Sequence, residues 1–223
     1  CRRNVEQQIA VARNTPPATA DAPRNVLVIG ASTGYGLASR IAAAWGYGAK
    51  TLGVFFERPP DGDKTATAGY YNTVAFAERA ERDGLFSAHV NGDAFSDECK
   101  RRTIEIIRRH LAPIDLVIYS LASPKRTHPR TGVVHNSVLK PIGRNFSSRT
   151  VELDSEKVVD VTLTSAAESE IADTVAVMGG EDWRMWIEAL AGENLLARGA
   201  RALAYSYIGP ELTWPIYRDG TIG

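Results

Sequence analysis

The chain has 223 residues, a length that suits one α/β domain. Acidic and basic residues are equal in number at 26 each, so no net charge favours nucleic acid or a membrane surface as a partner. No apolar run approaches the roughly 18 residues that a membrane span requires, so no stable membrane association is expected. Cys1 and Cys99 form neither a disulfide framework nor a zinc spacing, which predicts free thiols and a cytoplasmic location.

Short apolar runs alternate with amphipathic segments through the first half of the chain. A short helix over residues 4–13 and a Pro/Ala/Thr-rich linker come first. Strands are then predicted at residues 25–30, 51–56, 86–90 and 116–119. Helices are predicted at residues 34–45, 71–82 and 96–110, the last capped by Ser96. This alternation predicts an α/β fold, a Rossmann-like doubly wound parallel sheet.

The rhythm breaks in the second half. Residues 124–163 are rich in Pro, Ser, Thr and Val, which predicts a loop with short antiparallel strands, for example at 151–153 and 158–163. Ser165-Ala-Ala-Glu168 has a capping-box pattern that would open a helix to about Met178. A helix to about Leu196 and a strand at 201–208 are expected next. We therefore predict a single dinucleotide-binding domain over residues 1–223, with a small antiparallel insertion.

The clearest functional motif is Gly30-Ala31-Ser32-Thr33-Gly34-Tyr35-Gly36, between a predicted buried strand and a helix. Glycines there let the backbone turn sharply and approach a pyrophosphate, whose charge is favoured by the helix N-terminus. The spacing, Gly-x3-Gly-x-Gly, is the short-chain dehydrogenase variant. A glycine-rich turn that binds no nucleotide is the alternative, but the strand, loop and helix stand in the order that binding requires.

An acid is expected at the end of the second strand, about 20 residues later, to accept hydrogen bonds from the ribose hydroxyls of NAD. Glu57 stands there, directly after Phe56. Its carboxylate would repel the 2′-phosphate of NADPH, so we predict NADH as the preferred cofactor. Arg58 is adjacent and would soften this preference, and a solvated loop glutamate is the alternative.

Two further segments follow the third and fourth predicted strands. Asp93 and Ala94 form the acid-plus-small pair that such folds place against the adenine. Leu121 and Ala122 lie in a segment that can run beside the nicotinamide ribose. Each signal is weak alone, but together they mark the carboxyl ends of consecutive strands, where this architecture binds its ligand.

A catalytic tyrosine is harder to assign from spacing. Hydride transfer to a carbonyl or an enoyl thioester leaves negative charge on an oxygen, which a tyrosine hydroxyl beside a lysine can stabilise or protonate. No tyrosine of the chain has a lysine four or seven residues later. This argues against an ordinary ketone reductase and leaves Tyr205, Tyr207 and Tyr217 as late candidates.

Long strings of the chain resemble the FabV-type trans-2-enoyl-CoA/ACP reductases, long members of the short-chain dehydrogenase superfamily. The strings include Gly53-Val-Phe-Phe-Glu-Arg-Pro59 and Asn91-Gly-Asp-Ala-Phe-Ser-Asp97. The others are residues 25–40, 119–124, 126–129 and 175–183. The resemblance runs from Cys1 to Gly223, and it implies NADH-dependent reduction of the 2,3-double bond of an enoyl-CoA or enoyl-acyl-carrier-protein thioester, the last step of fatty-acid elongation.

The resemblance also assigns residues. The family's catalytic pair is Tyr-x8-Lys, and Tyr217 matches its tyrosine, while Tyr207 matches a tyrosine placed against the substrate thioester. The cofactor positions carried over are Gly30, Ala31, Ser32, Thr33, Gly34, Tyr35, Phe56, Glu57, Asp93, Ala94, Leu121 and Ala122. The family lysine would fall past Gly223, so we expect a fragment truncated at both ends whose activity is impaired. A monomer is expected.

Two other functions stay open: another NAD-dependent reductase, for instance of a ketone, and a non-catalytic module that senses NAD. The basic residues Lys125, Arg126 and Arg130 would meet CoA or carrier-protein phosphates, or simply lie in a solvated loop. The histidines lack ligand spacing, so no metal site is expected. Trp183 and Trp186 are expected to pack on a helix.

Overall fold

The computed structural model describes residues 1–15, 22–206 and 210–214, without the side chain of Leu212. Contacts divide the chain into two compact units. The first unit comprises residues 1–122 and 183–205, and the second comprises residues 123–182 with the chain after residue 205. The single domain over residues 1–223 stays a prediction.

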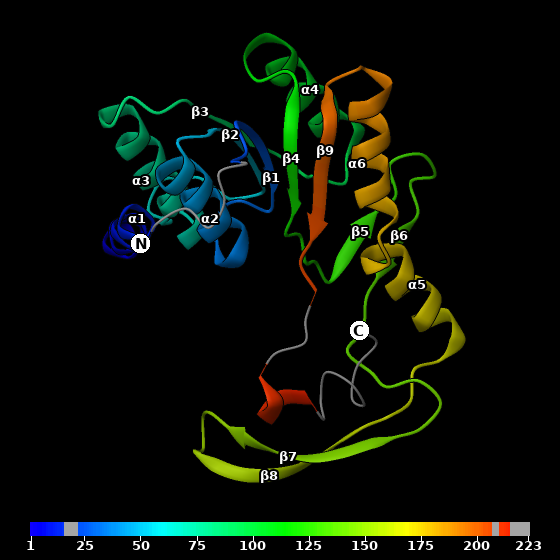
Figure 1. Ribbon diagram of the computed structural model, residues 1–223. Coiled ribbons are helices and arrows are strands. Elements are labelled where there is room, and N and C mark those ends of the chain that lie inside the picture. Colours follow the sequence, from blue (N-terminus) through cyan, green and yellow to red (C-terminus); the bar gives the residue numbers. More distant parts are fainter. Residues whose placement is uncertain (16–21, 207–209, 215–223) are drawn as a thin grey trace. The chain divides into compact units, whose positions relative to one another are not determined.

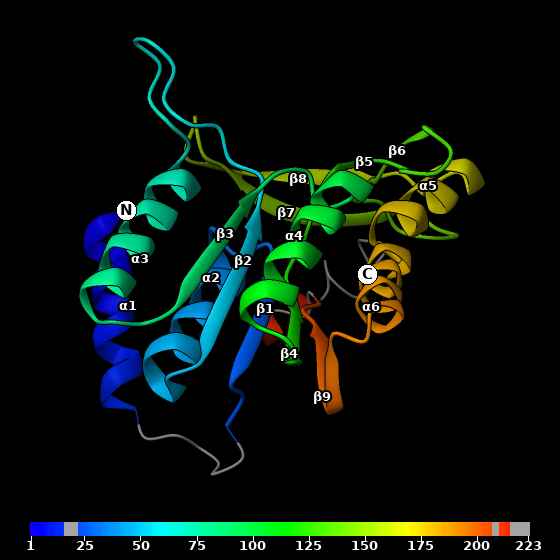
Figure 2. The ribbon, with the colours of Figure 1, turned by 90° about the horizontal axis from the view of Figure 1, so that it is seen from above.

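A five-stranded parallel sheet forms the centre of the first unit (Figures 1 and 2). Its order is β3-β2-β1-β4-β9, with β1 in the middle. The bounds are β1 (Asn25–Ile29), β2 (Lys50–Phe55), β3 (Ser87–Asn91), β4 (Ile114–Tyr119) and β9 (Leu196–Ala204). All four pairings are parallel, so the predicted doubly wound sheet is confirmed. Parallel strands bring all their carboxyl ends to one edge of the sheet.

Helices cover both faces of this sheet. The bounds of the covering helices are α2 (Gly34–Ile41), α3 (Ala68–Arg82), α4 (Asp97–His110) and α6 (Glu181–Gly192). Helix α1 (Arg2–Asn14) packs against α2 and α3. Successive side chains of β1 point to opposite faces, because Leu27 packs in a core cluster with α4 and α6 residues while Val28 packs beside Ala43. Trp186 of α6 is fully buried in the first of these clusters, as its spacing predicted.

Several element boundaries in the first unit differ from prediction. The helix predicted to end at residue 45 continues from α2 into one π-helical turn, η1 (Ala42–Gly46). Helix α6 ends at Gly192 and not near Leu196, because Asn194 takes a positive φ of 55° and reverses the chain. Strand β9 therefore begins at Leu196, earlier than the predicted residue 201.

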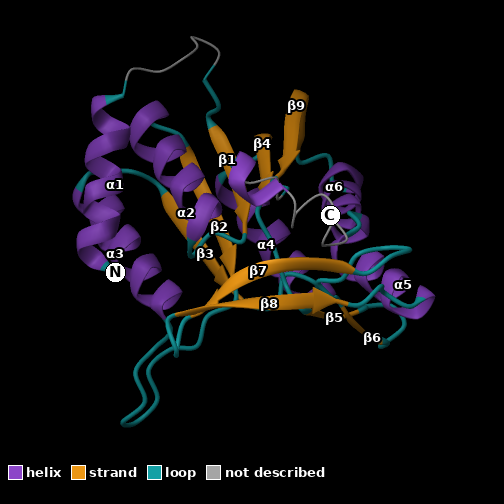
Figure 3. Cartoon of the chain, turned by 90° about the horizontal axis from the view of Figure 1, so that it is seen from below, coloured by secondary structure: helices purple, strands orange, loops and turns teal. Residues whose placement is uncertain are grey.

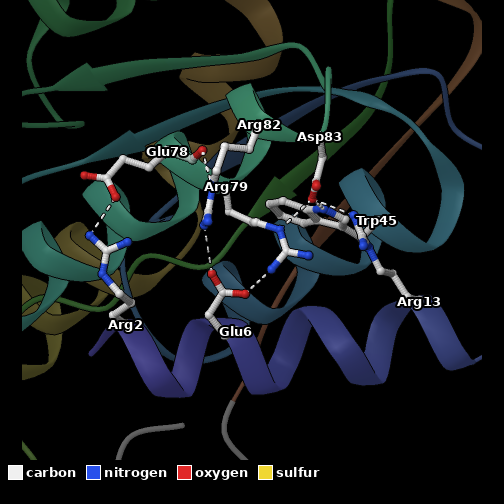
Figure 4. Close-up of polar contacts among 8 residues, drawn as sticks. All are labelled: Arg2, Glu6, Arg13, Trp45, Glu78, Arg79, Arg82 and Asp83. Carbon is white, nitrogen blue, oxygen red and sulfur yellow. Dashed lines mark hydrogen bonds and ion pairs between the residues drawn. The ribbon is translucent and has the colours of Figure 1, made fainter.

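Helix α1 is attached to α3 by apolar packing and by ion pairs. Val5 and Ile9 are buried in a cluster with residues of α2 and α3. Figure 4 shows the polar contacts around this packing. Glu6 pairs with Arg79 and Arg82 of α3, and Arg2 pairs with Glu78 at 2.6 Å.

Asp83, just after α3, completes this attachment. Its carboxylate accepts hydrogen bonds from Trp45 Nε1 at 2.7 Å, from Arg79 and from Arg13. Desolvation alone raises the pKa of Asp83, but the hydrogen bonds from Trp45, Arg79 and Arg13 outweigh it and lower the pKa below its ordinary value.

The second unit holds two antiparallel ribbons and a helix, with the longer ribbon clearly visible in Figure 3. The bounds are β5 (Lys125–Thr127), β6 (Val134–Asn136), β7 (Phe146–Glu152), β8 (Lys157–Leu163) and α5 (Glu168–Met178). A short 3-10 turn, η2 (Glu211–Thr213), follows later in the chain. The predicted small antiparallel element is confirmed, although β7 begins at Phe146 and not at residue 151.

The predicted capping box at Ser165 is wrong. Helix α5 begins at Glu168 with Ala167 as its cap residue. The carboxylate of Glu170 accepts a hydrogen bond from the Ala167 N–H at 2.9 Å. The N–H of Ser165 is held instead by the side chain of Asn145 at 3.0 Å, which keeps Ser165 outside the helix.

Arg126 behaves unlike a residue of a solvated basic loop. Its side chain is buried, and Nη1 donates to the Ala176 carbonyl at 2.6 Å and to the Glu181 carboxylate at 2.7 Å. These hydrogen bonds lower the pKa of Glu181 below its ordinary value. Arg126 is therefore a structural residue of the second unit, and the phosphate-contact alternative is not supported for its side chain.

Candidate functional site

The loop between β1 and α2 is shaped by two glycines that leave no room for a side chain. A Cβ on Gly30 would lie 2.1 Å from the Ser120 carbonyl oxygen, and Gly30 also has a positive φ of 85°. A Cβ on Gly36 would lie 2.0 Å from the Gly30 carbonyl oxygen. The N–H groups of Gly30 and Ala31 both donate to the Val54 carbonyl, which fixes the loop to β2. The glycines therefore let the loop fold tightly over the carboxyl ends of β1 and β4.

Gly34, in contrast to Gly30 and Gly36, has open space around it. It has a positive φ of 54°, and nothing lies within 4 Å of the position its Cβ would take. Thr33 precedes the first residue of α2, and no side chain caps that helix N-terminus. An open backbone at an uncapped helix start can accept an anion such as a diphosphate. The role of this loop in binding a pyrophosphate stays a prediction.

Two aromatic side chains beside this loop are unusually exposed. Tyr35 is 70% exposed and Phe56, at the end of β2, is 77% exposed. The ring of Tyr35 stacks on that of Tyr205, with centroids 5.4 Å apart. Ser39 Oγ donates to the Tyr35 carbonyl at 2.7 Å and lies 2.6 Å from the Tyr205 hydroxyl. Because Ser39 has one proton, the hydroxyl of Tyr205 is the donor in the second contact.

Glu57 lies at the end of β2, where the ribose acid was expected. Its Oε1 accepts a hydrogen bond from Ser32 Oγ at 2.6 Å, so the phosphate loop and the acid touch directly. The side chain of Asn91, the last residue of β3, binds the main chain of Glu57 twice, at 2.9 and 2.8 Å. The structure therefore brings Ser32 and Glu57 together and clamps the backbone that carries the acid.

Hydrogen bonds hold the segment that follows β3. The Asp93 carboxylate accepts a hydrogen bond from the Phe95 N–H at 3.0 Å, and Ala94 is buried. The Ala94 carbonyl accepts hydrogen bonds from Lys100 Nζ at 2.9 Å and from Trp186 Nε1 at 3.2 Å. A buried lysine and a buried tryptophan thus brace the loop that was expected to contact the adenine.

Leu121 and Ala122 follow β4, the strand that pairs with β1. The N–H of Ser120 donates to the Ile29 carbonyl at 2.8 Å, so this segment starts directly beside the phosphate loop. Leu121 packs partly buried against the main core cluster, while Ala122 is exposed. The described cofactor candidates therefore gather at the carboxyl edge of β1, β2, β3 and β4, on four adjacent strands.

Comparison with known proteins identifies the family. Residues 64–223 match the trans-2-enoyl-CoA reductase catalytic region, and residues 1–62 match the NAD(P)H binding domain of trans-2-enoyl-CoA reductase. The chain belongs to the trans-2-enoyl-CoA reductase family. The resemblance noted from the sequence is confirmed.

Individual relatives agree with the family assignment. A Euglena gracilis trans-2-enoyl-CoA reductase is 56% identical over 223 residues, covering 100% of this chain and 41% of the relative. An Opitutus terrae enoyl-[acyl-carrier-protein] reductase [NADH] is 57% identical over 204 residues, covering 92% of this chain and 52% of the relative. The crystal structure of the Treponema denticola trans-2-enoyl-CoA reductase in complex with NAD superposes with a TM-score of 0.93 at 50% identity. That superposition covers 99% of this chain and 56% of the other. The chain thus spans 41% to 56% of the length of these family members.

The trans-2-enoyl-CoA reductase motif that carries the predicted chemistry lies outside the described residues. Both Tyr207, the predicted substrate contact, and Tyr217, the predicted catalytic tyrosine, fall there. Their roles remain predictions drawn from the family pattern. In the described part of the chain, no group of three or more His, Cys, Asp or Glu side chains is placed to hold a metal ion. The helices described also include none with the length and apolarity needed to cross a membrane.

A buried arginine that was not expected from the sequence lies in the first unit. Arg40 of α2 is 1% exposed, and its guanidinium binds Thr51 Oγ1, the Ala88 carbonyl and His89 Nδ1. It also lies 4.2 Å from the centroid of the Phe76 ring. Burial lowers the pKa of Arg40 to about 9, and none of the ion pairs among the described residues gives it a carboxylate partner. The residue spacing does not predict this burial, because an arginine in an amphipathic helix ordinarily lies on the solvent-exposed face.

Proposed function

We propose that this protein uses NADH to reduce the 2,3-double bond of trans-2-enoyl thioesters of CoA or acyl-carrier protein, the last step of fatty-acid elongation. The observation that carries the proposal is the match of residues 1–62 and 64–223 to the cofactor-binding and catalytic regions of one enzyme family. The relative from Opitutus terrae is named for NADH, and the Treponema denticola structure is named as a complex with NAD.

The open phosphate loop supports the cofactor half of this proposal. The backbone at Gly34 and the uncapped start of α2 would hold the pyrophosphate. Glu57 would accept the ribose hydroxyls and disfavour the 2′-phosphate of NADPH. Tyr35, Phe56 and Asp93 would complete the adenosine and diphosphate surroundings, with Ala94, Leu121 and Ala122 along the remaining backbone.

The predicted chemistry rests on Tyr217. NADH, when bound, supplies the hydride that adds to the β-carbon of the enoyl thioester. Negative charge then develops on the thioester oxygen, where the Tyr217 hydroxyl would donate a hydrogen bond or a proton. Tyr207 would orient the thioester in the same site. A lysine nine positions after Tyr217, as in the family's Tyr-x8-Lys pattern, would favour the charged form of the tyrosine.

That pattern makes a direct prediction about the chain. Its lysine would stand at the third position after Gly223, so we propose that turnover of enoyl thioesters depends on a chain that includes that position. A version continued through that lysine to the length of the relatives should be fast. We also propose a cytoplasmic monomer. The two free cysteines fit the reducing compartment that this location implies.

The test follows NADH oxidation with crotonyl-CoA, using both chain lengths, with acetoacetyl-CoA and NADPH as comparisons. We expect rapid oxidation of NADH with crotonyl-CoA by the longer chain, at least a hundredfold loss in Tyr217→Phe, and a raised KM in Tyr207→Phe. Tyr47→Phe is the matched control, since Tyr47 lies at the end of η1 and outside the site.

Two outcomes would overturn the proposal. If the longer chain binds NADH but reduces no enoyl thioester, the hypothesis of a non-catalytic nucleotide sensor is favoured. If acetoacetyl-CoA is reduced faster than crotonyl-CoA, the protein acts on ketones. Full activity in Tyr217→Phe would remove that tyrosine from the mechanism while leaving the reaction in place.

A further inference from the structure

The Glu57 carboxylate lies between the hydroxyl of Ser32 and the backbone of Gly69. Ser32 Oγ donates to Glu57 Oε1 at 2.6 Å. On the other side, a Cβ built on Gly69 would lie 1.9 Å from the same oxygen, 2.4 Å from Cδ and 2.9 Å from Oε2. The carboxylate of Glu57 therefore occupies the space that any side chain at position 69 would need.

The backbone conformation of Gly69 does not require glycine. Gly69 is the second residue of α3, and its φ lies outside the left-handed range that favours glycine. Glycine near a helix start weakens the helix relative to alanine. The three heavy atoms nearest to the Cβ position of Gly69 all belong to the Glu57 carboxyl group. Space for that carboxylate is thus the physical reason for glycine at position 69.

The first turn of α3 lies directly beside the Glu57 carboxylate. Thr67, the residue before α3, makes no side-chain capping bond, so the helix start keeps N–H groups and a positive dipole end beside the carboxylate. Asn72 of α3 donates to the Ser32 carbonyl at 3.1 Å. That bond ties the same helix to the loop that provides the Ser32 hydroxyl. Helix α3 thereby leaves space for the acid and is bonded to the residue that donates to it.

We propose that Gly69 is a specificity-determining position for the cofactor, acting through Glu57. By leaving the carboxylate in place at the end of β2, it keeps a negative charge where an adenosine ribose binds in this architecture. A side chain at position 69 would displace Glu57 towards solvent and reduce repulsion of a 2′-phosphate. Arg58, exposed and next in the chain, would then provide positive charge for that phosphate. This inference rests on the proposed NADH-dependent function.

The test compares the dissociation constants of NADH and NADPH, measured by the fluorescence of the bound nucleotide. Gly69→Ala should lower the ratio of the NADPH constant to the NADH constant about tenfold or more. Glu57→Gln should lower it by a similar factor, and the double variant should show little further change, because both substitutions act on one carboxylate. Ser32→Ala removes the donor without adding bulk, and it should lower the ratio less.

Gly192→Ala is the matched control, because nothing lies within 4 Å of its Cβ position in α6. That variant should leave the ratio unchanged. An unchanged ratio in Gly69→Ala, or an equal loss of affinity for both nucleotides in that variant, would overturn this inference and leave the proposed NADH-dependent function in place. If the unsubstituted chain binds neither nucleotide, or binds NADPH as tightly as NADH, the NADH-dependent function fails together with this inference.

Discussion

The guanidinium of Arg40 on α2 fills the space that a side chain at position 53 would need on β2. A Cβ on Gly53 would lie 2.3 Å from Arg40 Nη1 and 2.9 Å from the Cβ of Ala31 in the phosphate loop. The φ of Gly53 lies outside the left-handed range, so glycine serves here to provide space and not an unusual backbone conformation. A buried cation therefore packs directly beneath the loop that is proposed to bind a diphosphate.

Gly53→Ala should destabilise the protein. The added methyl group would force Arg40 or Ala31 to move in a close-packed interior, and overpacking of this kind costs about 1 to 3 kcal/mol in the free energy of unfolding. Urea denaturation measures this loss. In the double variant Gly53→Ala/Arg40→Met the two costs should not add, because methionine is more flexible and lacks the guanidinium. Additive costs would contradict the close contact between positions 40 and 53.

His89, the partner of Arg40, predicts a dependence of stability on pH. Burial, with a smaller contribution from the charge of Arg40, lowers the pKa of His89 to about 3. The unfolded chain takes up a proton at a pKa near 6.5 and the folded chain does not, so stability should fall as the pH decreases from about 6.5 towards 3. The expected slope from this residue is about 1.4 kcal/mol per pH unit.

His89→Gln tests this slope, since glutamine keeps a hydrogen-bond acceptor for Arg40 and cannot titrate. Free energies of unfolding at pH 7, 6, 5 and 4 should decrease less steeply in the variant than in the unsubstituted protein. Equal slopes would show that His89 is protonated in the folded state. His135→Gln is a suitable control, because His135 lies in the second unit, 2.8 Å from the Asp173 carboxylate.

The parallel sheet was predictable from the sequence because its cause is local. Each central strand is a short unbroken apolar run, and each is bounded by a turn and an amphipathic helix. The position of Glu57 was predictable for the same reason, since it depends only on where β2 ends. The capping box at Ser165 failed because Asn145, distant in sequence, binds the N–H of Ser165.

The supports of the candidate site could not be predicted in this way. Contacts of Glu57 with Ser32 and Gly69 arise only when β1, β2 and α3 come together in three dimensions. Nothing in the local pattern distinguishes Gly69 from an ordinary helix-start glycine. The role of Lys100 could not be predicted either, because the charged residues of α4 predict a solvent-exposed face. In the structure this lysine is 5% exposed and donates a hydrogen bond to the Ala94 carbonyl.

Asp83→Asn should loosen α1 from α3. The lowered pKa of Asp83 means that the folded state stabilises its charged form, so this contribution is present above about pH 4 and is lost as the pH falls through the folded pKa. We expect a loss of about 1 to 3 kcal/mol in the free energy of unfolding at pH 7. The loss should shrink below pH 4, as measured by denaturation at several pH values. Asp63→Asn, at an exposed loop position, should change little, and a loss of equal size there would contradict a specific role for Asp83.

Tyr205 is expected to affect cofactor binding through Tyr35. Its ring stacks on Tyr35, its hydroxyl donates to Ser39 at 2.6 Å, and Ser39 in turn donates to the Tyr35 carbonyl. Tyr205→Phe keeps the stacking and removes one hydrogen bond, which is worth about 0.5 to 1.5 kcal/mol. The dissociation constant of NADH should therefore rise by a factor of roughly 2 to 12. Ser39→Ala should weaken binding at least as much, and the double variant should resemble Ser39→Ala, since both changes break the same contact. NADH titrations of the three variants decide the matter, and unchanged affinity in Tyr205→Phe would mean that this contact does not support Tyr35 when the cofactor is bound.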